Sequence, residues 1–392
     1  MSSAPTLIAS PRAPAGPAHR LNRDTSGIWH VRGYAEAREI MRLDVTQAGF
    51  RAEDALKAPG NLIRPVLFVD GEEHRLQRSQ IGKYFSPNTT HDRHQPLMER
   101  WADDLVAEFR QAGHGDLTDL AGRMAASVVA EIVGLTDSVR PGMVDRLGEI
   151  LHYPGTPGPT LGGFYHLLAN NWFMLKFWWF DVRPSIAARR LMPKFDVISH
   201  LIAKKRNAIS IVAECVTYGA AGQATTRELI PTVAWHCLRR PEFLAIMRGD
   251  DHEARQRLIQ EILRVEPVIR VLSRRTKETL TVPTDGEIAT IPAGALIHFH
   301  VAEINQDERI FGDDAGEIRV DRSYDKGVPL SLMSFGSGPH RCAGEYVALL
   351  QTDIFLRRFL AIEGIRIEAD PTYHYSEKVG GYELGRFPIS LG

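Results

Sequence analysis

The residues with the clearest chemical potential form a short loop that contains a cysteine. The stretch from Phe335 to Gly344 reads Phe-Gly-Ser-Gly-Pro-His-Arg-Cys-Ala-Gly. Its glycines and proline allow the backbone to turn sharply and to approach a flat, bulky group. Cys342 stands just before a predicted helix, and a helix N-terminus stabilises a thiolate and lowers its pKa. Such a thiolate suits a metal ligand, whereas a lone cysteine beside a Gly-rich turn is more commonly buried and inert.

This loop resembles the haem-binding loop of the cytochrome P450 family, Phe-Gly-x-Gly-x-His-x-Cys-x-Gly, at every fixed position. The resemblance extends from about Trp29 to the C-terminus. It implies the mostly α cytochrome P450 fold with small β sheets, built around one haem b (iron protoporphyrin IX) that Cys342 binds through its thiolate. Thiolate ligation of haem pushes electron density toward O–O cleavage. The loop residues that the resemblance assigns to the cofactor are Phe335, Gly336, His340, Cys342 and Gly344.

Further basic residues match the family's contacts to the haem propionates. His74 and Arg78 stand at i and i+4 of a predicted helix that starts near Asp70, so both side chains can face one carboxylate. Arg274 matches an arginine that opens a strand, and His340 belongs to the cysteine loop. Cationic donors suit two buried propionates because charge-assisted hydrogen bonds offset desolvation. Taken singly, each of these residues could equally be a surface charge.

A Glu/Arg pair lies upstream of the cysteine loop. Glu261 and Arg264 resemble the family's Glu-x-x-Arg pair, on a predicted helix where i and i+3 share a face. By itself such a pair is common, and a solvated ion pair contributes little. In the family an arginine from the loop before the cysteine joins the pair, and Arg322 is at the matching position. The resemblance therefore predicts that Glu261, Arg264 and Arg322 form a structural lock on the proximal side of the haem, without a chemical role.

The stretch from Ala220 to Thr226, AAGQATT, resembles the centre of the family's long distal helix. Small residues there would let the helix pass close over the haem face. A threonine hydroxyl can bond back to the carbonyl at i−4 and open a local kink that accepts O₂ or water. Thr225 aligns best with the family's oxygen-handling threonine, and Thr226 is the second catalytic candidate. Without the cysteine loop, a core helix with an Ala/Gly packing face would be the better interpretation.

The distal helix also carries the clearest departure from the family. An Asp or Glu usually precedes the threonine, and this chain has Ala224 there. Proton delivery normally needs a relay with a carboxylic acid as one link. Here the relay runs through Thr225, Thr226, Gln223 and water, or it involves Glu228 one turn on. Otherwise the substrate supplies the proton, or the chemistry differs from simple hydroxylation.

A substrate pocket on the distal side is the second expectation from the resemblance. Small-molecule pockets are mostly apolar, and Arg270 is the exception, which either pairs with a substrate carboxylate or points to solvent. Residues 164–180, rich in Trp and Phe but interrupted by polar side chains, predict an interfacial or lid helix, or an ordinary core helix, and no membrane span. The expected pocket residues are Ala220, Ala221, Val268, Arg270 and Val271.

Periodicity in the sequence outlines the elements that would position these residues. Helical spacing predicts helices at 96–112, 119–133, 186–206, 211–239, 253–265 and 344–360. Strand-like runs occur at 28–31, 280–282, 288–291 and 296–298, where Gly and Pro break them. Residues 305–334 show little periodicity, and a stretch that long inside a compact domain usually has a functional reason.

Bulk properties limit the location and the partners. The 392 residues carry a formal net charge of −1, so no global field attracts nucleic acid or an anionic membrane. The three cysteines lack paired spacing, which fits a reducing cytoplasm. Residues 1–20 are rich in Pro, Ala and Ser and predict a flexible tail, followed by a single haem domain over 21–392.

Together these features predict a soluble, bacterial-type cytochrome P450 monooxygenase. It would activate O₂ and oxidise a small apolar or aromatic substrate, as in natural-product biosynthesis. Neither a P-loop nor a convincing Rossmann glycine pattern is present, so electrons would come from a separate ferredoxin and its reductase. These would dock near Arg341, Arg357 and Arg358. Two alternatives stay open: peroxide-driven, oxidative-coupling or desaturating chemistry in the same fold, suggested by Ala224, and a non-catalytic haem-binding sensor.

Overall fold

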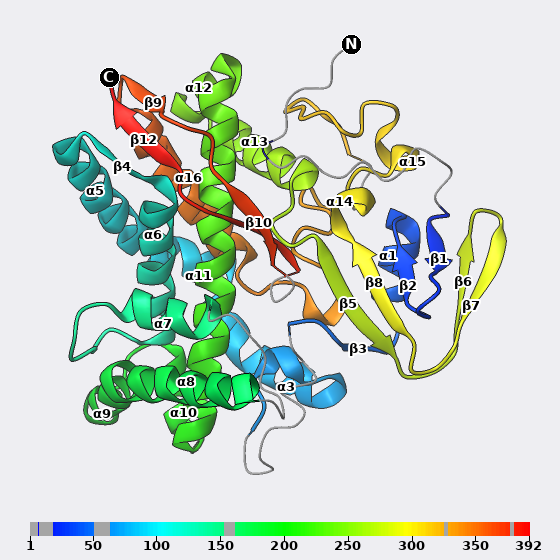
Figure 1. Ribbon diagram of the computed structural model, residues 1–392, viewed down its shortest axis with the longest axis horizontal. Coiled ribbons are helices and arrows are strands. Elements are labelled where there is room, and N and C mark those ends of the chain that lie inside the picture. Colours follow the sequence, from blue (N-terminus) through cyan, green and yellow to red (C-terminus); the bar gives the residue numbers. More distant parts are fainter. Residues whose placement is uncertain (1–6, 8–18, 51–62, 153–160, 325–327, 377–379) are drawn as a thin grey trace.

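The computed structural model describes the chain except for residues 1–6, 8–18, 51–62, 153–160, 325–327 and 377–379. Figure 1 shows helices gathered on one side of the molecule and most of the strands on the other. The predicted fold class, mostly helical with small sheets, is confirmed. Within the described ranges, no helix combines the length and the apolar character needed to cross a membrane.

A long central helix, α11, organises the helical side. Asn207 caps its N-terminus, because the Asn207 side chain accepts a hydrogen bond from the N–H of Ser210. Two glycines let neighbouring helices approach closely. A Cβ on Gly222 would lie 2.9 Å from Val129, and one on Gly219 would lie 2.8 Å from Leu147. These glycines therefore serve helix packing, and of the two only Gly222 belongs to the stretch 220–226. The helical core comprises α5 (Gln95–Ala112), α6 (Leu117–Val133), α11 (Ala208–Arg239), α12 (Pro241–Arg248), α13 (His252–Val265) and α16 (Glu345–Leu360).

The other described helices surround this core. The predicted helix at 186–206 is wrong in one respect, because it breaks at Met192 and restarts after Asp196. Pro193 lies in the break, and the Asp196 side chain caps the second helix by accepting from the N–H of Ser199. These helices are α1 (Tyr34–Ile40), α3 (Gly71–Ile81), α4 (Pro87–Thr89), α7 (Met143–His152), α8 (Leu161–Phe177), α9 (Arg183–Leu191), α10 (Val197–Ala203), α14 (Val301–Ile304) and α15 (Glu308–Phe311).

Small sheets lie beside and behind the helices. The largest has the strand order β1-β2-β8-β5-β3, with β2 and β8 parallel and the other pairs antiparallel. Its strands are β1 (Leu21–Arg23), β2 (Trp29–Val31), β8 (Leu296–His300), β5 (Val271–Thr276) and β3 (Val45–Gln47). The remaining sheets are the hairpins β6–β7 (Leu280–Thr284 and Glu287–Ile291) and β10–β11 (Tyr373–Ser376 and Gly381–Leu384), and the sheet β4-β12-β9 (His114–Asp116, Pro388–Leu391 and Ile365–Ile367).

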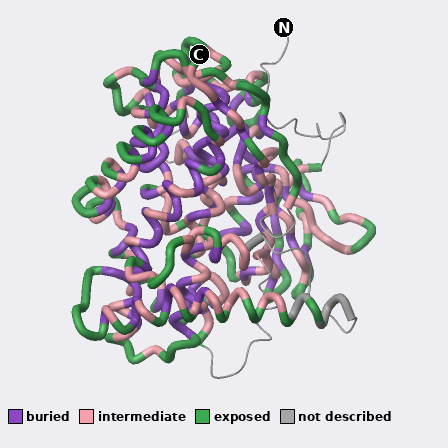
Figure 2. Tube along the Cα trace, turned by 60° about the vertical axis from the view of Figure 1, so that its left-hand side comes forward, coloured by how far each residue is buried: buried purple, intermediate pink, exposed green. Residues whose placement is uncertain are grey.

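Burial follows this division into a helical and a sheet-rich part. One apolar cluster fills the helical bundle, and a second lies between the large sheet, α1 and the segment before the cysteine loop. Figure 2 shows the buried trace running through the interior of both parts. The predicted N-terminal tail falls mostly outside the described residues. Leu7 is described and buried, and its N–H donates to Glu266 at 2.9 Å.

Candidate functional site

The cysteine loop is held in one conformation by its glycines and by a backbone hydrogen bond. Gly336 and Gly338 have φ values of 70° and 69°, in the left-handed region that favours glycine. At Gly338 a Cβ would also lie 2.2 Å from the carbonyl oxygen of Met41, so no other residue fits. The N–H of Cys342 donates to the carbonyl of Phe335 at 2.8 Å and closes the loop. The loop therefore presents the Cys342 side chain just before α16 begins.

Two opposing influences act on the thiol of Cys342. Although the residue is exposed on one side, desolvation by the surrounding protein raises its pKa, while the N–H of Gly344 and the charge of Arg78 lower it. Desolvation is the larger effect, so the pKa of the thiol is raised, while the N–H at the start of α16 acts in the predicted direction. A metal cation at the sulfur deprotonates a thiol outright.

Basic side chains from separate elements converge next to this loop. Arg78, on α3, donates from Nη2 to the carbonyl of Arg341 at 2.6 Å. The rings of His74 and His340 lie 4.1 Å apart, centroid to centroid. Burial, followed by the charges of His340 and Arg78, lowers the pKa of His74 to about 4. Arg274, on β5, is 4% exposed and bonds to Gln47 and to the carbonyl of Ser273. The structure thus brings together all four predicted propionate contacts.

This basic cluster has too few carboxylates for its positive charge. Burial lowers the pKa of Arg274 to about 10, because the guanidinium is desolvated without a matched anion. Within the described ranges, Asp70 is the one carboxylate bound to the cluster, through His340 at 2.9 Å. A group that brings two carboxylates would supply the missing charge. The residues present therefore fit a haem with its propionates.

The donor set around Cys342 fits the same group. In the part of the chain that the structure describes, no three His, Cys, Asp or Glu side chains are placed to hold a metal ion together. A porphyrin supplies four nitrogen ligands of its own and needs one axial ligand from the protein. The single side chain of Cys342 fits this requirement.

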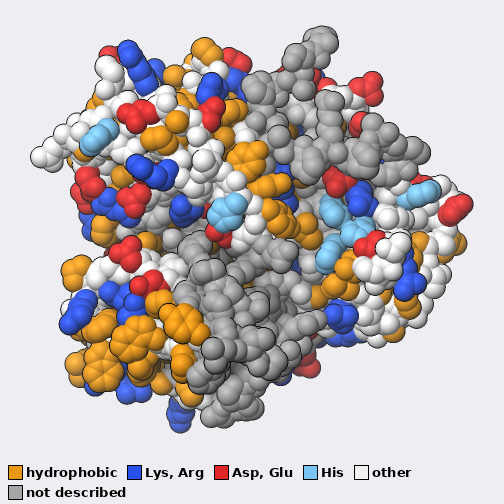
Figure 3. Space-filling model, in the orientation of Figure 1, with side chains coloured by type: hydrophobic (Ala, Val, Ile, Leu, Met, Phe, Trp, Pro, Cys, Tyr) orange, Lys and Arg blue, Asp and Glu red, His pale blue; other side chains and the backbone are white. Residues whose placement is uncertain are grey.

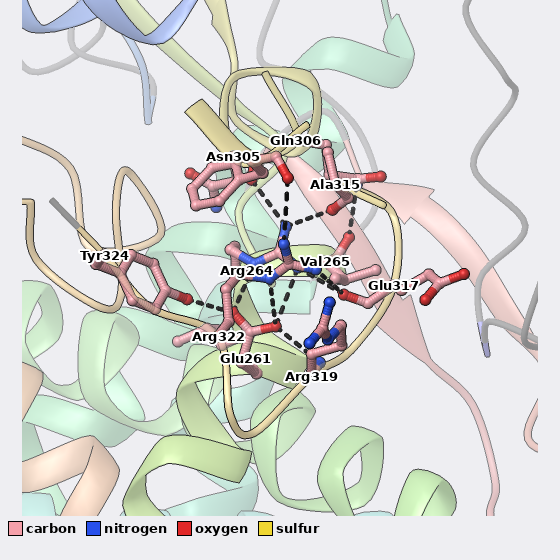
Figure 4. Close-up of polar contacts among 12 residues, drawn as sticks. Glu261, Arg264, Val265, Asn305, Gln306, Ala315, Glu317, Arg319, Arg322 and Tyr324 are labelled. Carbon is pink, nitrogen blue, oxygen red and sulfur yellow. Dashed lines mark hydrogen bonds and ion pairs between the residues drawn. The ribbon is translucent and has the colours of Figure 1, made fainter. Parts of the chain in front are cut away.

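The predicted lock residues contact one another, as Figure 4 shows. Arg264 is fully buried, and its guanidinium bonds both carboxylate oxygens of Glu261, at 2.8 and 3.0 Å. Arg322 approaches the same carboxylate at 3.5 Å. Burial opposes ionisation of Glu261, yet the hydrogen bonds from Arg264 and Tyr324 hold its pKa below the usual value. Tyr324 is a member of this cluster that the sequence motif does not include.

The lock ties down the segment of low periodicity. Arg264 donates to the carbonyls of Asn305, Ala315 and Glu317 at 3.1, 2.5 and 2.7 Å. The N–H of Arg319 donates to Glu261 at 3.0 Å. Two buried side chains on α13 thus replace the regular secondary structure that this segment lacks, which explains how it stays compact.

The two candidate threonines of α11 point in different directions. Thr225 is half-buried, and its hydroxyl donates to the carbonyl of Ala221 at 2.7 Å, the back-bond predicted for it. Thr226 is buried, and its hydroxyl accepts from the Gln351 side chain of α16 at 3.2 Å. Only Thr225 shares a face with the exposed Ala221. The structure therefore does not bring Thr226 to the same place as Thr225.

Glu228 stands on the same helix face as Ala221 and Thr225, at i+7 and i+3. Its carboxylate accepts from the N–H of Leu384 at 2.7 Å and pairs with Arg227. Burial raises the pKa of Glu228 to about 7. Arg227 and Leu384 also line a cavity of about 880 Å³ between α6, α7, α11 and the hairpin β10–β11. Glu228 is therefore separated from this cavity only by its own hydrogen-bond partners Arg227 and Leu384.

The expected pocket residues divide between two faces. Arg270 is buried, and its guanidinium lies 5.0 Å from the ring centroid of Tyr382. Val271 points to the opposite face of β5 from Leu272 and Arg274, and it pairs with His300. Val271 is thus set apart from the other site residues. Ala220 is half-buried, Ala221 is exposed, and Val268 is half-buried against the helical core.

Sequence reasoning missed the aromatic side chains of the hairpin β10–β11. Tyr373 and Tyr375 each contact Tyr382 edge-on, at 5.5 and 5.4 Å between centroids. The signal for this hairpin was Gly380-Gly381, because a Cβ on Gly381 would lie 2.1 Å from the carbonyl of Val268. Those glycines let the hairpin press against the segment that carries Arg270.

The arginines expected to receive a redox partner are already paired. Arg341 bonds Glu345 at 2.8 Å, Arg357 bonds Asp250 at 2.7 Å, and Arg358 bonds Asp103 at 2.8 Å. A depression of about 390 Å³ lies beside the cysteine loop. Its lining includes Arg38, Arg42 and Arg341. This depression therefore gathers three arginines beside the loop, whereas Arg357 and Arg358 are each paired with an aspartate.

Comparisons with known proteins agree with this geometry. The family model described as Cytochrome P450 matches residues 255–361, which contain the lock and the cysteine loop. The chain is 27% identical to "Cytochrome P450 130" of Mycobacterium tuberculosis, over 76% of this chain and 71% of that protein. It is also 27% identical to "Cyclomarin C epoxidase CymV" of Salinispora arenicola, over 85% of this chain and 81% of that protein. The crystal structure of CalO2 superposes with a TM-score of 0.79 at 21% identity, covering 95% of this chain and 93% of that one.

Proposed function

Because the chain belongs to the cytochrome P450 family and is an oxidoreductase of that family, we propose that it is a haem b monooxygenase acting on a small apolar or aromatic organic molecule. When bound, haem supplies activation of O₂ and insertion of oxygen into the substrate. The observation that carries the proposal is the loop that presents Cys342 beside four basic side chains with a single carboxylate partner. The proposed unit is one haem domain over residues 21–392. A cytoplasmic location is part of the proposal, because Cys215 and Cys237 are buried and free.

We propose that Cys342 holds the iron and that His74, Arg78, Arg274 and His340 hold the propionates. Charge-assisted hydrogen bonds from Arg78 and Arg274 would orient such a group, and the rings of His74 and His340 would donate further hydrogen bonds. Asp70 keeps His340 in position through its hydrogen bond. The backbone of Gly336 and the partly buried ring of Phe335 form the wall of the loop.

Arg274→Gln tests the propionate site. We expect the variant to lose haem about 10- to 100-fold more readily than wild type, the range typical of partners that support a metal ligand. Transfer of haem to a globin that lacks it would measure the loss. Arg275→Gln is the matched control, because Arg275 is on the opposite face of β5 and donates to the carbonyl of Gly294. Equal haem loss by the two variants would contradict the assignment.

Natural-product tailoring is the substrate class that we favour. The epoxidase of Salinispora arenicola is named for cyclomarin C, and a hydroxylase of Saccharopolyspora erythraea is named for erythromycin. The aromatic hairpin β10–β11 and Arg270 are in contact, with the Arg270 guanidinium 5.0 Å from the Tyr382 ring centroid, and we propose that they border the distal side of the haem. Aromatic rings suit an apolar or aromatic substrate, and a buried guanidinium would select a substrate with a carboxylate or a carbonyl near one end.

We propose that protons reach the distal side through Thr225 and Glu228. The Thr225 hydroxyl donates to the Ala221 carbonyl in the resting protein. To relay a proton it would turn away from this carbonyl, give its own proton to the acceptor and take another from water. Glu228 replaces the acid that Ala224 does not provide, and a carboxyl with a pKa of about 7 is matched to work near neutral pH. Water in the cavity beside Arg227 would reload it.

The raised pKa of Glu228 predicts a pH-dependent effect on stability. The folded chain keeps this proton up to about pH 7, whereas the unfolded chain releases it near 4.5. Stability therefore falls as the pH rises through this window. Glu228→Gln cannot ionise, so relative to wild type it should gain roughly 2–3 kcal/mol between about pH 5 and pH 8.

Urea unfolding at several pH values measures this difference. The exposed Glu253→Gln on α13 serves as the control and should follow wild type at every pH. If the Glu228→Gln and wild-type curves stay parallel from pH 5 to pH 8, Glu228 does not titrate as we propose.

Electrons are proposed to come from a separate ferredoxin and its reductase. Their acidic docking surface would meet the basic depression around Arg38, Arg42 and Arg341, because opposite charges steer such encounters. A second candidate chemistry, driven by peroxide or leading to coupling or desaturation, is favoured by one observation. Ala224 is not an acid, and both carboxylate oxygens of Glu228 are already engaged.

One experiment tests the function and separates these chemistries. Candidate substrates are incubated with O₂, NADPH, ferredoxin and reductase, or with hydrogen peroxide alone, and product is followed by mass spectrometry. Incorporation of ¹⁸O from ¹⁸O₂ only with the redox chain supports the monooxygenase. Equal or faster turnover with peroxide alone supports the second candidate. If a compound shifts the haem spectrum, and so binds, but gives no product under either set of conditions, both candidate chemistries are contradicted.

A further inference from the structure

The outer face of α8 carries a regular stripe of exposed apolar side chains. Leu168, Trp172 and Leu175 are 52%, 59% and 52% exposed, and Tyr165, one turn earlier, is 66% exposed. Trp179, which is 52% exposed, continues the stripe in the π-helical turn Trp178–Val182 that follows α8. Figure 3 shows hydrophobic side chains gathered over this helix on the face in view. Monomeric proteins seldom expose contiguous apolar surface of this size, and such patches mark interaction sites.

The spacing of the stripe is that of a coiled-coil seam. Its residues, from Tyr165 to Trp179, follow one another at intervals of three, four, three and four. The opposite side of the helix packs inward, since Phe177 is fully buried and Met174 contacts the helical core. The helix therefore has two apolar faces: one packs against the core, and the stripe on the other is exposed.

Residue size alternates along this seam. The first position of each repeat is aromatic, at Tyr165, Trp172 and Trp179, and the intervening position is leucine, at Leu168 and Leu175. In an antiparallel pair of identical helices, each first position lies opposite a fourth position of the partner. With Trp172 opposite Leu175 of the second copy, Trp179 lies opposite Leu168, so both tryptophan rings meet a leucine. Alternation of large and small residues across facing positions is what close packing requires. A parallel pair would instead set tryptophan against tryptophan.

The charges around the stripe favour another protein copy over a lipid surface. The stripe itself is uncharged, so two copies can meet without like-charge repulsion. Lys176, next to it, is paired with Glu149, and the Arg183 guanidinium lies 4.3 Å from the centroid of the Trp179 ring. Helices that lie on anionic membranes instead offer unpaired basic residues along their polar face.

We propose that a second copy of this chain covers the stripe, with the two α8 helices antiparallel about a two-fold axis. A specific interface buries about 1,200–2,000 Å² over both copies, and five large side chains that are each more than half exposed offer an apolar centre for one. A two-fold arrangement uses the same patch on both partners and closes on itself. The dimer is independent of the proposed haem chemistry.

Size-exclusion chromatography with light scattering tests the dimer. The haem-loaded chain is measured from about 1 to 100 µM, because association depends on concentration. Wild type should become dimeric within this range. Trp172→Glu should weaken the dimer at least about 100-fold, because it removes a central aromatic side chain and sets a charge against apolar groups. Ile288→Glu is the control. Ile288 is 68% exposed but lies on the hairpin β6–β7, away from the stripe, so this variant should dimerise like wild type.

Cysteine cross-linking tests the antiparallel arrangement. Trp172→Cys mixed with Leu175→Cys should form more disulfide-linked dimer on mild oxidation than either variant alone, since first and fourth positions face each other. A monomer at every concentration would overturn the proposal, as would binding of the monomer to phosphatidylglycerol vesicles through Trp172. Preferential cross-linking of Trp172→Cys with itself would overturn the antiparallel pairing.

Discussion

Cys342→Ser should abolish the red-shifted Soret band that reduced, thiolate-ligated haem shows with carbon monoxide. A serine hydroxyl stays protonated at neutral pH and cannot replace a thiolate that donates electron density to iron. Product formation should fall more than about 100-fold, because even the outer partners of metal ligands cost 10- to 100-fold when removed. The change is small in volume, and Cys342 is exposed on one side, so the fold should tolerate it. The absorbance spectrum of the reduced protein with carbon monoxide measures the effect.

Cys215→Ala is the control for this substitution. Cys215 is fully buried on α11, and burial raises the pKa of its thiol, so it stays a neutral core side chain. We expect this variant to keep the red-shifted band even if it loses some stability through the smaller side chain. Persistence of the band in Cys342→Ser would show that another residue ligates the iron. A band like that of histidine-ligated haem in the wild type would have the same meaning.

The sequence was sufficient to predict the parts of the site that depend on local geometry. Positions 336 and 338 require glycine because both have positive φ angles and, at 338, because the Met41 carbonyl is close. A requirement of this kind can be recognised from the glycines in the sequence. The limits of the predicted helices other than 186–206 were close for a different reason, because periodic burial of one face leaves a periodic pattern in the sequence. The predicted helix at 253–265, for instance, is observed as α13, one residue longer.

Properties that depend on several distant elements were not predictable in this way. The net pKa of Cys342 reflects desolvation by neighbours from other elements, and the sequence shows only the helix that follows. Thr225 and Thr226 are adjacent in the sequence, yet their environments differ because Gln351 of α16 donates to Thr226 and not to Thr225. The hairpin β10–β11 lies against the segment that carries Arg270 because Gly381 allows a close backbone approach to Val268, a long-range contact that the sequence does not show.

Arg264→Gln should destabilise the protein by about 3–5 kcal/mol, the largest stability effect that we predict. The substitution leaves Glu261 buried without its main cation, and it removes donors from the carbonyls of Asn305, Ala315 and Glu317. Both losses cost free energy, since buried charges and buried acceptors need partners. The segment that follows α14 has little regular structure, so it depends on these bonds, and the cysteine loop lies just beyond it. Haem retention should therefore fall together with stability.

The same helix provides a matched control in Arg257→Gln. Arg257 pairs with Glu253 at 3.0 Å, but the two side chains are 40% and 76% exposed. An exposed pair of this kind contributes no more than about 1 kcal/mol. Urea unfolding of both variants, followed by fluorescence and by the Soret band, compares the two pairs under identical conditions. If Arg264→Gln were no more destabilising than Arg257→Gln, the buried pair would not act as a lock, and the irregular segment would have to be held by other contacts such as those of Arg322 with Asp314.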